Sequence, residues 1–219
     1  FRNCICGNPT QVAFLFGQCN IAAAQWATVL NGFKSCATGC QSSVLSSGIC
    51  NLSSGWLSQI VNGSTNLACC VNSSIVNANR SCATANNATI VSGGFHCNGV
   101  QAGLIAGGSY NYLTNSAGAL CAFGATILNG IGNNTSGGTF SNSPTTNNGM
   151  GCFTVLPTIS DTGCFSLIGN GFQNIAQANF SSIVNGYCNN IASGNTGSSI
   201  INGCCNTISG IYSYNVIAG

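Results

Sequence analysis

Few residues of this 219-residue chain could do acid–base or metal chemistry. It has one acidic side chain, Asp161, and one histidine, His96. General acid–base catalysis by paired carboxylates needs two acids. A Ser-His-Asp triad would need His96 and Asp161 together, but the repeat described below places them on different coils. No Cys-x-x-Cys pair accompanies His96, as a zinc site of the usual spacing would require. We therefore predict no enzyme activity, no cofactor and no metal site.

Cysteine is the only reactive residue type that is abundant, with 16 in the chain. Seven cysteines follow the spacing of the repeat, which would stack them in neighbouring coils. They could form a ladder of small buried side chains or disulfides between coils, and both alternatives stay open. Cysteine use this heavy predicts an extracellular location, on a cell surface or a virion surface. The candidate stacked or disulfide-forming cysteines are Cys19, Cys36, Cys50, Cys82, Cys97, Cys188 and Cys205.

The chain carries almost no charge: 2% of its residues are charged, and its formal net charge is +2. Ordinary soluble domains carry about 25% charged residues. The basic side chains that would neutralise phosphates are missing, which argues against nucleic-acid binding. The best candidate for a membrane span, residues 12–30, is interrupted by Gln18, Asn20 and Gln25. We therefore expect no membrane span.

A tandem repeat must position all of these residues. It is clearest in Ser181–Gly219, where an apolar pair, an Asn-Gly, a Cys-Asn and an isolated Ile recur about every 16 or 17 residues. From Phe14-Leu15 to Leu104-Ile105 the apolar pair recurs in steps close to 15 residues, and it returns at Ile127-Leu128 and Leu167-Ile168. A unit this short fits two short strands, with Asn-Gly, Ser-Gly and Gly-Gly at the turns. The sequence predicts an all-β fold, a parallel β-solenoid (β-roll or β-helix) of about 13 coils with two short strands per coil.

The repeat divides the chain into four segments. Residues 1–11 are expected to cap or lead into the solenoid, 12–136 to form repeats, 137–164 to be an irregular insertion, and 165–219 to form repeats that stop within a unit. Proline removes a donor from a strand ladder, so the insertion should leave the stack. Loops on rigid scaffolds often carry recognition, and a cell-surface or glycan receptor is the partner we expect there. The candidate recognition residues are Pro144, Met150, Pro157 and Asp161.

The adjacent apolar pair predicts an apolar stripe on the outside of the rod. Neighbouring side chains of a strand point to opposite faces, so one member of each pair fills the coil and the other faces outward. A stripe this long exceeds what monomers normally expose. Packing it against a second copy gives a homo-oligomer, with a trimer or an open filament as possible forms. The candidate stripe residues are Val29, Leu30, Val44, Leu45, Ile60, Val61, Ile75, Val76, Ile90, Val91, Ile183, Val184, Ile200 and Ile201.

The motif Ser-Ile-Ile-Asn-Gly…Cys-Asn-Thr-Ile-Ser-Gly in Ser199–Gly210 resembles the head repeats of trimeric autotransporter adhesins and the repeats of phage and giant-virus tail-fibre proteins. The resemblance covers Ser166–Gly219 well and Phe14–Gly108 loosely. It implies a left-handed, homotrimeric parallel β-roll that serves as a non-enzymatic extracellular fibre or adhesive module. The alternatives are an open-ended filament or sheath subunit and an ice-binding β-solenoid. An ice-binding solenoid should show a Thr-x-Thr ladder, which this repeat lacks.

Overall fold

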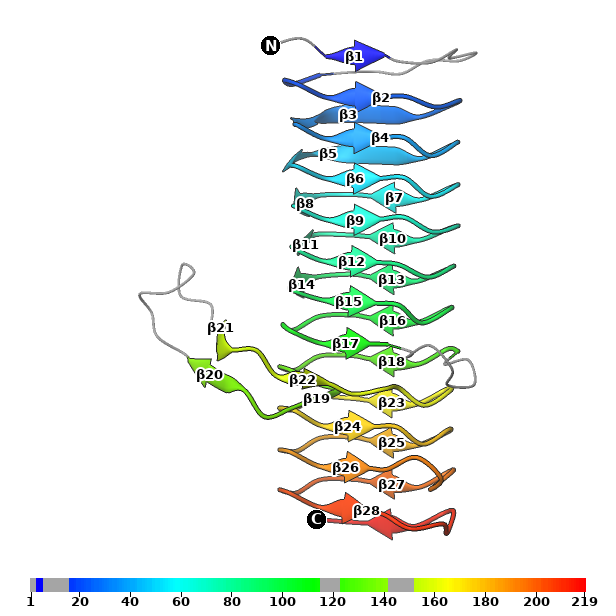
Figure 1. Ribbon diagram of the computed structural model, residues 1–219, viewed down its shortest axis with the longest axis vertical. Coiled ribbons are helices and arrows are strands. Elements are labelled where there is room, and N and C mark those ends of the chain that lie inside the picture. The colour runs from blue at the N-terminus through cyan, green and yellow to red at the C-terminus, as the bar shows by residue number, and fades with distance from the viewer. Residues whose placement is uncertain (1–2, 6–15, 115–122, 142–151) are drawn as a thin grey trace.

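The computed structural model describes residues 3–5, 16–114, 123–141 and 152–219. These form a straight rod of stacked coils (Figure 1), and the prediction of an all-β parallel solenoid is confirmed. The stack has about 12 turns with a spacing near 15 residues. Thr126 pairs directly with Leu167, so the whole insertion between them belongs to a single coil. No helix occurs within the described ranges.

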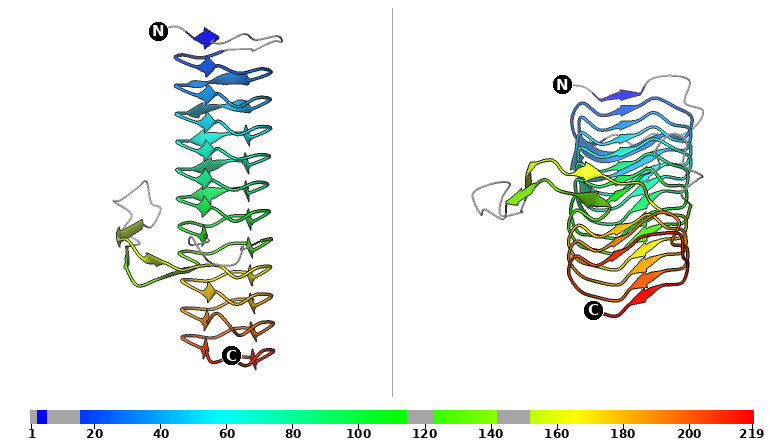
Figure 2. Two further views of the ribbon diagram at one scale, coloured as in Figure 1. Left: turned by 45° about the vertical axis from the view of Figure 1, so that its right-hand side comes forward. Right: turned by 60° about the horizontal axis from the view of Figure 1, so that its bottom comes forward.

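Two parallel sheets face one another across the rod, as Figure 2 shows. We call them sheet A and sheet B. Sheet A consists of β1 (Cys4–Ile5), β2 (Ile21–Ala22), β4 (Cys36–Ala37), β6 (Leu52–Ser53), β9 (Leu67–Ala68), β12 (Cys82–Ala83), β15 (Cys97–Asn98) and β17 (Tyr112–Leu113). After the insertion the same position in the coil is taken by β24 (Ile175–Ala176), β26 (Asn190–Ile191) and β28 (Thr207–Ile208). Because β1 pairs in register with β2, the stack already includes part of the segment assigned to a cap.

Sheet B contains the apolar pairs of the repeat. Its strands are β3 (Thr28–Phe33), β5 (Ser43–Ile49), β7 (Gln59–Ile60), β10 (Ser74–Ile75), β13 (Thr89–Ile90), β16 (Leu104–Ile105), β18 (Thr126–Ile127), β23 (Leu167–Ile168), β25 (Ser182–Ile183), β27 (Ser199–Ile200) and β29 (Val216–Ile217). A narrow face joins sheet B to sheet A through β8 (Gly63–Ser64), β11 (Ala78–Asn79) and β14 (Gly93–Gly94). Single bridges such as Phe172 with Tyr187 continue this face toward the C-terminus.

The core is a column of aliphatic side chains from sheet B packed against smaller ones from sheet A. Ile75 and Ile90 of sheet B are fully buried, as are Ala68 and Ala83 of sheet A. Burying one isoleucine contributes about 1.5–3 kcal/mol. Since strand side chains alternate between faces, the residue after each core isoleucine must point to solvent.

A ladder of buried asparagines closes the turn that enters sheet A. The Nδ2 of Asn174 donates to the carbonyl oxygens of Asn170 (3.2 Å) and Gly186 (2.9 Å). Its Oδ1 accepts the N–H of Asn189, one coil further on, at 3.1 Å. Asn174 therefore satisfies backbone groups of its own coil and of the next. The ladder consists of Asn20, Ser35, Asn51, Asn66, Ser81, His96, Asn111, Asn133, Asn174, Asn189 and Asn206.

Each coil also turns at two single residues in the left-handed conformation, and most of these are not glycine. Arg80 (φ 49°) and Phe95 (φ 58°) lie at the corner beside the narrow face, and Asn87 (φ 57°) and Phe180 (φ 55°) lie at the opposite corner. The left-handed conformation costs a non-glycine residue about 1 kcal/mol. Glycine is required elsewhere: Gly171 has φ 118°, and a Cβ there would meet the carbonyl oxygen of Gly186.

The insertion leaves sheet A as an arm at the side of the rod (Figure 1). Its described parts form two antiparallel pairs, β19 (Thr135–Ser136) with β22 (Thr158–Ile159) and β20 (Thr139–Ser141) with β21 (Cys152–Val155). Pro144 and Met150 lie outside the described residues. Where the arm leaves, Asn134 bridges the gap in sheet A: its Nδ2 donates to the Tyr112 carbonyl (3.0 Å) and its Oδ1 accepts the Ala176 N–H (3.0 Å). This side chain adds to backbone hydrogen bonds at the same place, from the Tyr112 N–H to the Asn133 carbonyl (3.1 Å) and from the Asn134 N–H to the Asn174 carbonyl (2.7 Å).

Candidate functional site

The structure divides each predicted apolar pair between the core and the surface. The first members are buried, namely Val29, Val44, Ile60, Ile75, Ile90, Ile183 and Ile200. The second members face outward from sheet B: Leu30, Val91, Val184 and Ile201 are 40–50% exposed, and Val61 and Val76 are half-buried. The side chain of Leu45 lies outside the described part. Leu128, which is 47% exposed, extends this row. The row is interrupted at Ala106 and Gly169, where the outward side chain is small or absent. We call the outward row the sheet-B stripe.

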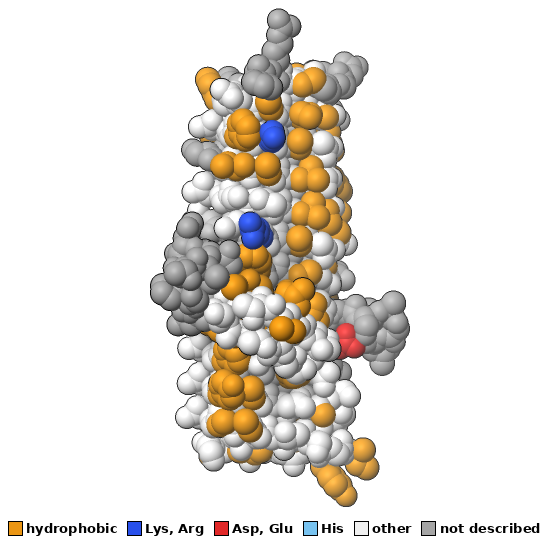
Figure 3. All heavy atoms as spheres, turned by 60° about the vertical axis from the view of Figure 1, so that its left-hand side comes forward, with side chains coloured by type: hydrophobic (Ala, Val, Ile, Leu, Met, Phe, Trp, Pro, Cys, Tyr) orange, Lys and Arg blue, Asp and Glu red, His pale blue; other side chains and the backbone are white. Residues whose placement is uncertain are grey.

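A second apolar row, on the outside of sheet A, was not recognised in the sequence. Figure 3 shows apolar side chains in columns along the upper part of the rod. Within the row, Leu52 is exposed, and Leu67 and Tyr112 are half-buried. Its residue types change from coil to coil, which hides the pattern in the sequence. The row consists of Ile21, Cys36, Leu52, Leu67, Cys82, Cys97 and Tyr112.

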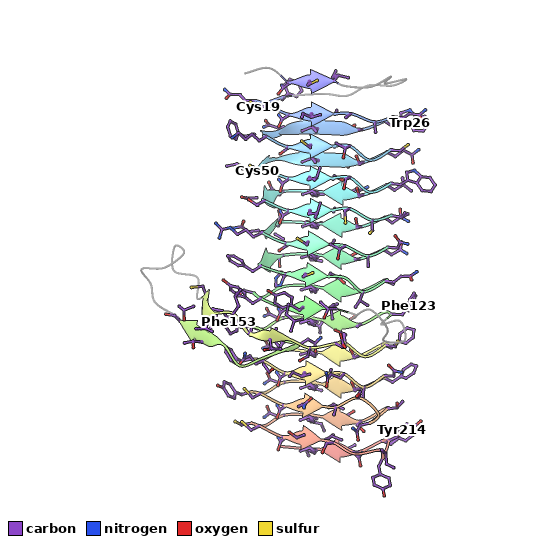
Figure 4. All side chains as sticks on the ribbon, viewed as in Figure 1. Cys19, Trp26, Cys50, Phe123, Phe153 and Tyr214 are labelled. Atoms are coloured by element: carbon purple, nitrogen blue, oxygen red, sulfur yellow. The ribbon has the colours of Figure 1, made fainter. Side chains whose placement is uncertain are left out.

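The seven candidate cysteines fall into two separate rows. Cys36, Cys82 and Cys97 belong to the outer row of sheet A, and Cys82 is the register partner of Cys97. Burial raises the pKa of both of these thiols. The other four occupy the left-handed corner beside the narrow face, where Figure 4 shows two of them on one edge of the rod; they are Cys19, Cys50, Cys188 and Cys205. All seven are free thiols in the structure, and disulfides between coils stay a prediction.

His96 and Asp161, the residues considered for acid–base chemistry, lie in different surroundings. His96 is 2% exposed and occupies a rung of the ladder, where its Nδ1 accepts the Asn111 N–H at 3.2 Å. Desolvation lowers its pKa to about 4, which keeps the imidazole neutral. Asp161 follows the arm and lines a hollow of about 420 Å³ with Thr162 and Asn179. No three metal-binding side chains come together in the described ranges.

An aromatic cluster holds the arm against the narrow face. Phe153 of β21 is 7% exposed, and its ring contacts Tyr110 edge-on at 5.2 Å between ring centroids. Phe140 of β20 contacts both Phe153 (5.2 Å) and Phe172 (5.6 Å) in the same way. Tyr110 precedes the insertion and Phe172 follows it, so the arm packs on coils of both parts of the rod. Such aromatic pairs contribute about 0.5–1.5 kcal/mol each beyond the area they bury.

Beside this cluster the narrow face is hollowed into a groove of about 610 Å³. One wall carries the exposed amides of Asn129 and Asn170, and the other carries apolar side chains. The floor is bare backbone, because glycine is needed where successive coils approach closely. We call this the amide groove; its lining includes Asn129, Gly130, Ile131, Asn170, Gly171, Phe172, Gly186 and Tyr187. No charged side chain lines it.

A second hollow of about 360 Å³ lies on the same face toward the N-terminus. It has the same construction, with Asn62 and Asn77 beside Gly63, but Ser64 stands where the amide groove has an aromatic ring. Sequence reasoning placed recognition in the insertion, and its Pro157 and Asp161 are not part of either groove. The signal available in the sequence was the recurring Asn-Gly followed by a large side chain.

Comparison of the chain with protein-family models and with curated proteins finds no match. Within the described ranges there is no helix with the length and apolar character needed to cross a membrane.

Proposed function

We propose that this chain is a non-enzymatic structural or adhesive fibre module that works outside the cell, on a cell surface or a virion surface. The observation that carries the proposal is the sheet-B stripe, which exposes aliphatic side chains at the same place on successive coils of a straight rod. Its exposed members lie on both sides of the arm, with Leu30, Val91 and Leu128 before it and Val184 and Ile201 after it.

The stripe is suited to a second copy of the same rod. Neighbouring strands in a sheet are about 4.8 Å apart, so two parallel rods would match side chain to side chain along their length. Each Å² of apolar surface removed from water contributes about 25 cal/mol. With one acid and three basic residues in the chain, like charges do not oppose this contact. The simplest form is a closed homo-oligomer such as a trimer, and the abundant cysteine fits an extracellular setting.

The ice-binding alternative gains no support from the outer face of sheet B. Its other outward row has threonine at Thr28, Thr89 and Thr126, but the second outward residue of those strands is Leu30, Val91 or Leu128. A Thr-x-Thr ladder is therefore not formed on the described strands.

Native mass by light scattering, measured at several concentrations, tests the proposal. We expect a fixed multiple of the chain mass of 22.0 kDa. The double variant Val91→Lys/Val184→Lys should become monomeric, because it buries two charges in the contact. The matched control Thr38→Lys/Gln101→Lys adds the same charge at exposed positions off the stripe and should keep the multiple. A monomeric wild-type chain at all concentrations contradicts the proposal, and mass that grows without limit favours the filament alternative.

A further inference from the structure

The amide groove repeats one three-residue unit on successive coils. The units are Asn129-Gly130-Ile131, Asn170-Gly171-Phe172 and Asn185-Gly186-Tyr187, and their third residues pair as consecutive bridges of the narrow face. Stacking the units produces three parallel rows along the rod: amides, a glycine floor and an apolar wall. Its volume of about 610 Å³ lies within the range of about 300–1,000 Å³ that is typical of ligand sites.

The amides of the groove are available to a ligand. The backbone carbonyls of Asn129 and Asn170 accept hydrogen bonds from the buried ladder. Their side-chain amides are exposed, and no partner for them occurs in the described part of the chain. Asn185, in the third unit, is exposed as well but does not line the groove. Each free amide offers two donors and one acceptor oxygen, so the row provides alternating donors and acceptors at coil spacing.

The apolar wall presents aromatic edges and one ring face. Phe172 and Tyr187 stack with centroids 5.2 Å apart and planes 8° from parallel. Ring edges carry partial positive charge, which suits ether and hydroxyl oxygens. Tyr187 is 50% exposed, and its neighbour in the next coil is Cys204, whose side chain is too small to cover a ring. A face of Tyr187 is therefore free to pack against aliphatic C–H groups.

We propose that the amide groove binds a neutral polysaccharide, with the sugar chain running along the rod axis. A sugar chain needs many neutral donors and acceptors beside apolar C–H patches, and the groove supplies both in repeating rows. A charged ligand would find no counter-charge, because no Lys, Arg, Asp or Glu lines the groove. The attachment role rests on the proposed function above and gives that function a ligand class.

The second hollow provides a matched control within the same chain. It shares the amide row and the glycine floor through Asn62 and Gly63, but it is smaller and lacks an aromatic wall. Ser64 stands at the position that Phe172 and Tyr187 occupy in the amide groove. If the aromatic wall and the amides act together, only the amide groove should bind.

The test is co-sedimentation of the full chain with insoluble neutral polysaccharides: cellulose, chitin, curdlan and mannan. We expect binding to at least one, and a loss of about tenfold in partition coefficient for Asn170→Ala/Tyr187→Ala, which corresponds to 1.4 kcal/mol. The control Asn62→Ala/Ser64→Ala should bind like the wild type. No binding to any of the four, or equal binding by the two double variants, overturns the inference.

Native mass measured on the same samples separates this inference from the proposed function. If Asn170→Ala/Tyr187→Ala keeps the wild-type mass while its binding falls, the groove is a sugar site. If that variant changes the mass and the control variant does not, the groove is a contact between copies of the chain and the inference is wrong. An oligomer that binds none of the four polysaccharides leaves the fibre proposal standing and removes only the sugar site.

Discussion

The two parts of the rod on either side of the arm use the same ladder position differently. In residues 123–219 every described rung is an asparagine: Asn133, Asn174, Asn189 and Asn206. In residues 16–114 the ladder includes Ser35, Ser81 and His96. Ser81 Oγ and His96 Nδ1 each accept the N–H of the next coil at 3.2 Å, whereas the buried Ser35 Oγ has no hydrogen-bond partner among the described residues. Asparagine adds donors to carbonyl groups.

The outer surfaces of the two parts differ as well. Before the arm, the outer row of sheet A is apolar through Leu52 and Cys97, whereas after it the same row contains Asn190 and Thr207. After the arm, the narrow face gains the aromatic wall of the amide groove. The part with the more uniform interior thus has the more polar sheet-A surface.

The largest expected effect comes from removing a ladder asparagine in residues 123–219, where every described rung is an asparagine. Asn174→Ala leaves the Asn189 N–H without an acceptor and the Asn170 and Gly186 carbonyls without this donor, all in a fully buried site. We expect a loss of about 4 kcal/mol in the free energy of unfolding, since each unsatisfied buried group costs about 1–3 kcal/mol. Ser81→Ala should lose about 1 kcal/mol. It lies in residues 16–114, which we call the mixed part because its ladder also contains serine and histidine. Denaturant titration of both variants measures the difference, and equal losses would contradict the comparison.

The next effect is a pH dependence specific to the mixed part. The pKa of His96 is about 4 in the folded chain, against an ordinary value of 6.5, because burial disfavours the charged imidazole. Between these values the unfolded chain binds a proton that the folded chain does not, so stability is full above pH 6.5 and falls as the pH drops toward 4. The difference amounts to about 3 kcal/mol.

Thermal unfolding from pH 7 to pH 4 measures this effect. His96→Asn installs the rung used elsewhere and should remove most of the dependence. Asn189→Gln, outside the mixed part, should leave the slope with pH unchanged while lowering stability at every pH. A wild-type slope that persists in His96→Asn would show that another group is responsible.

The smallest effect concerns thiol reactivity in the two parts. Burial raises the pKa of the Cys97 thiol above its ordinary value of 9.0, so less thiolate is present at pH 8. Cys205 is exposed. We expect iodoacetamide to modify Cys97 about tenfold more slowly than Cys205, with the rate at Cys97 still rising beyond pH 9. Mass spectrometry of peptides over time measures both rates, and denatured chain, in which they should converge, is the control.

The repeat made the solenoid predictable, because the core isoleucines recur at a fixed spacing. The pattern was less informative where the order of the pair changes: at Leu104-Ile105 and Leu167-Ile168 the second residue is the buried one. Large side chains at left-handed corners, such as Phe95, could not be foreseen from intrinsic preferences, since the ladder fixes the backbone there. In the outer row of sheet A the position in the coil is constant but the residue type changes from coil to coil, so the sequence does not reveal the row.

The amide groove could not be assembled from the sequence because its parts are distant in the chain. Asn129 and Asn170 are separated by the whole arm, and they become neighbours only because Thr126 pairs with Leu167. The stripe was predictable at the level of individual pairs, since alternation along a strand turns one member of each pair outward. Its interruption at Gly169 is visible in the sequence once the register across the arm is known.

The place where the arm leaves has a mechanical consequence. Hydrogen bonds between coils run along the rod, so a pull on its two ends would load all the bonds of one coil boundary together. At the arm, sheet A has no strand between β17 and β24, and the Asn134 side chain spans the gap. The Phe153 ring contacts Tyr110, which precedes the arm in the chain, and Phe172, which follows it. The arm therefore adds aromatic packing that would resist separation of the coils at the place where it leaves the rod.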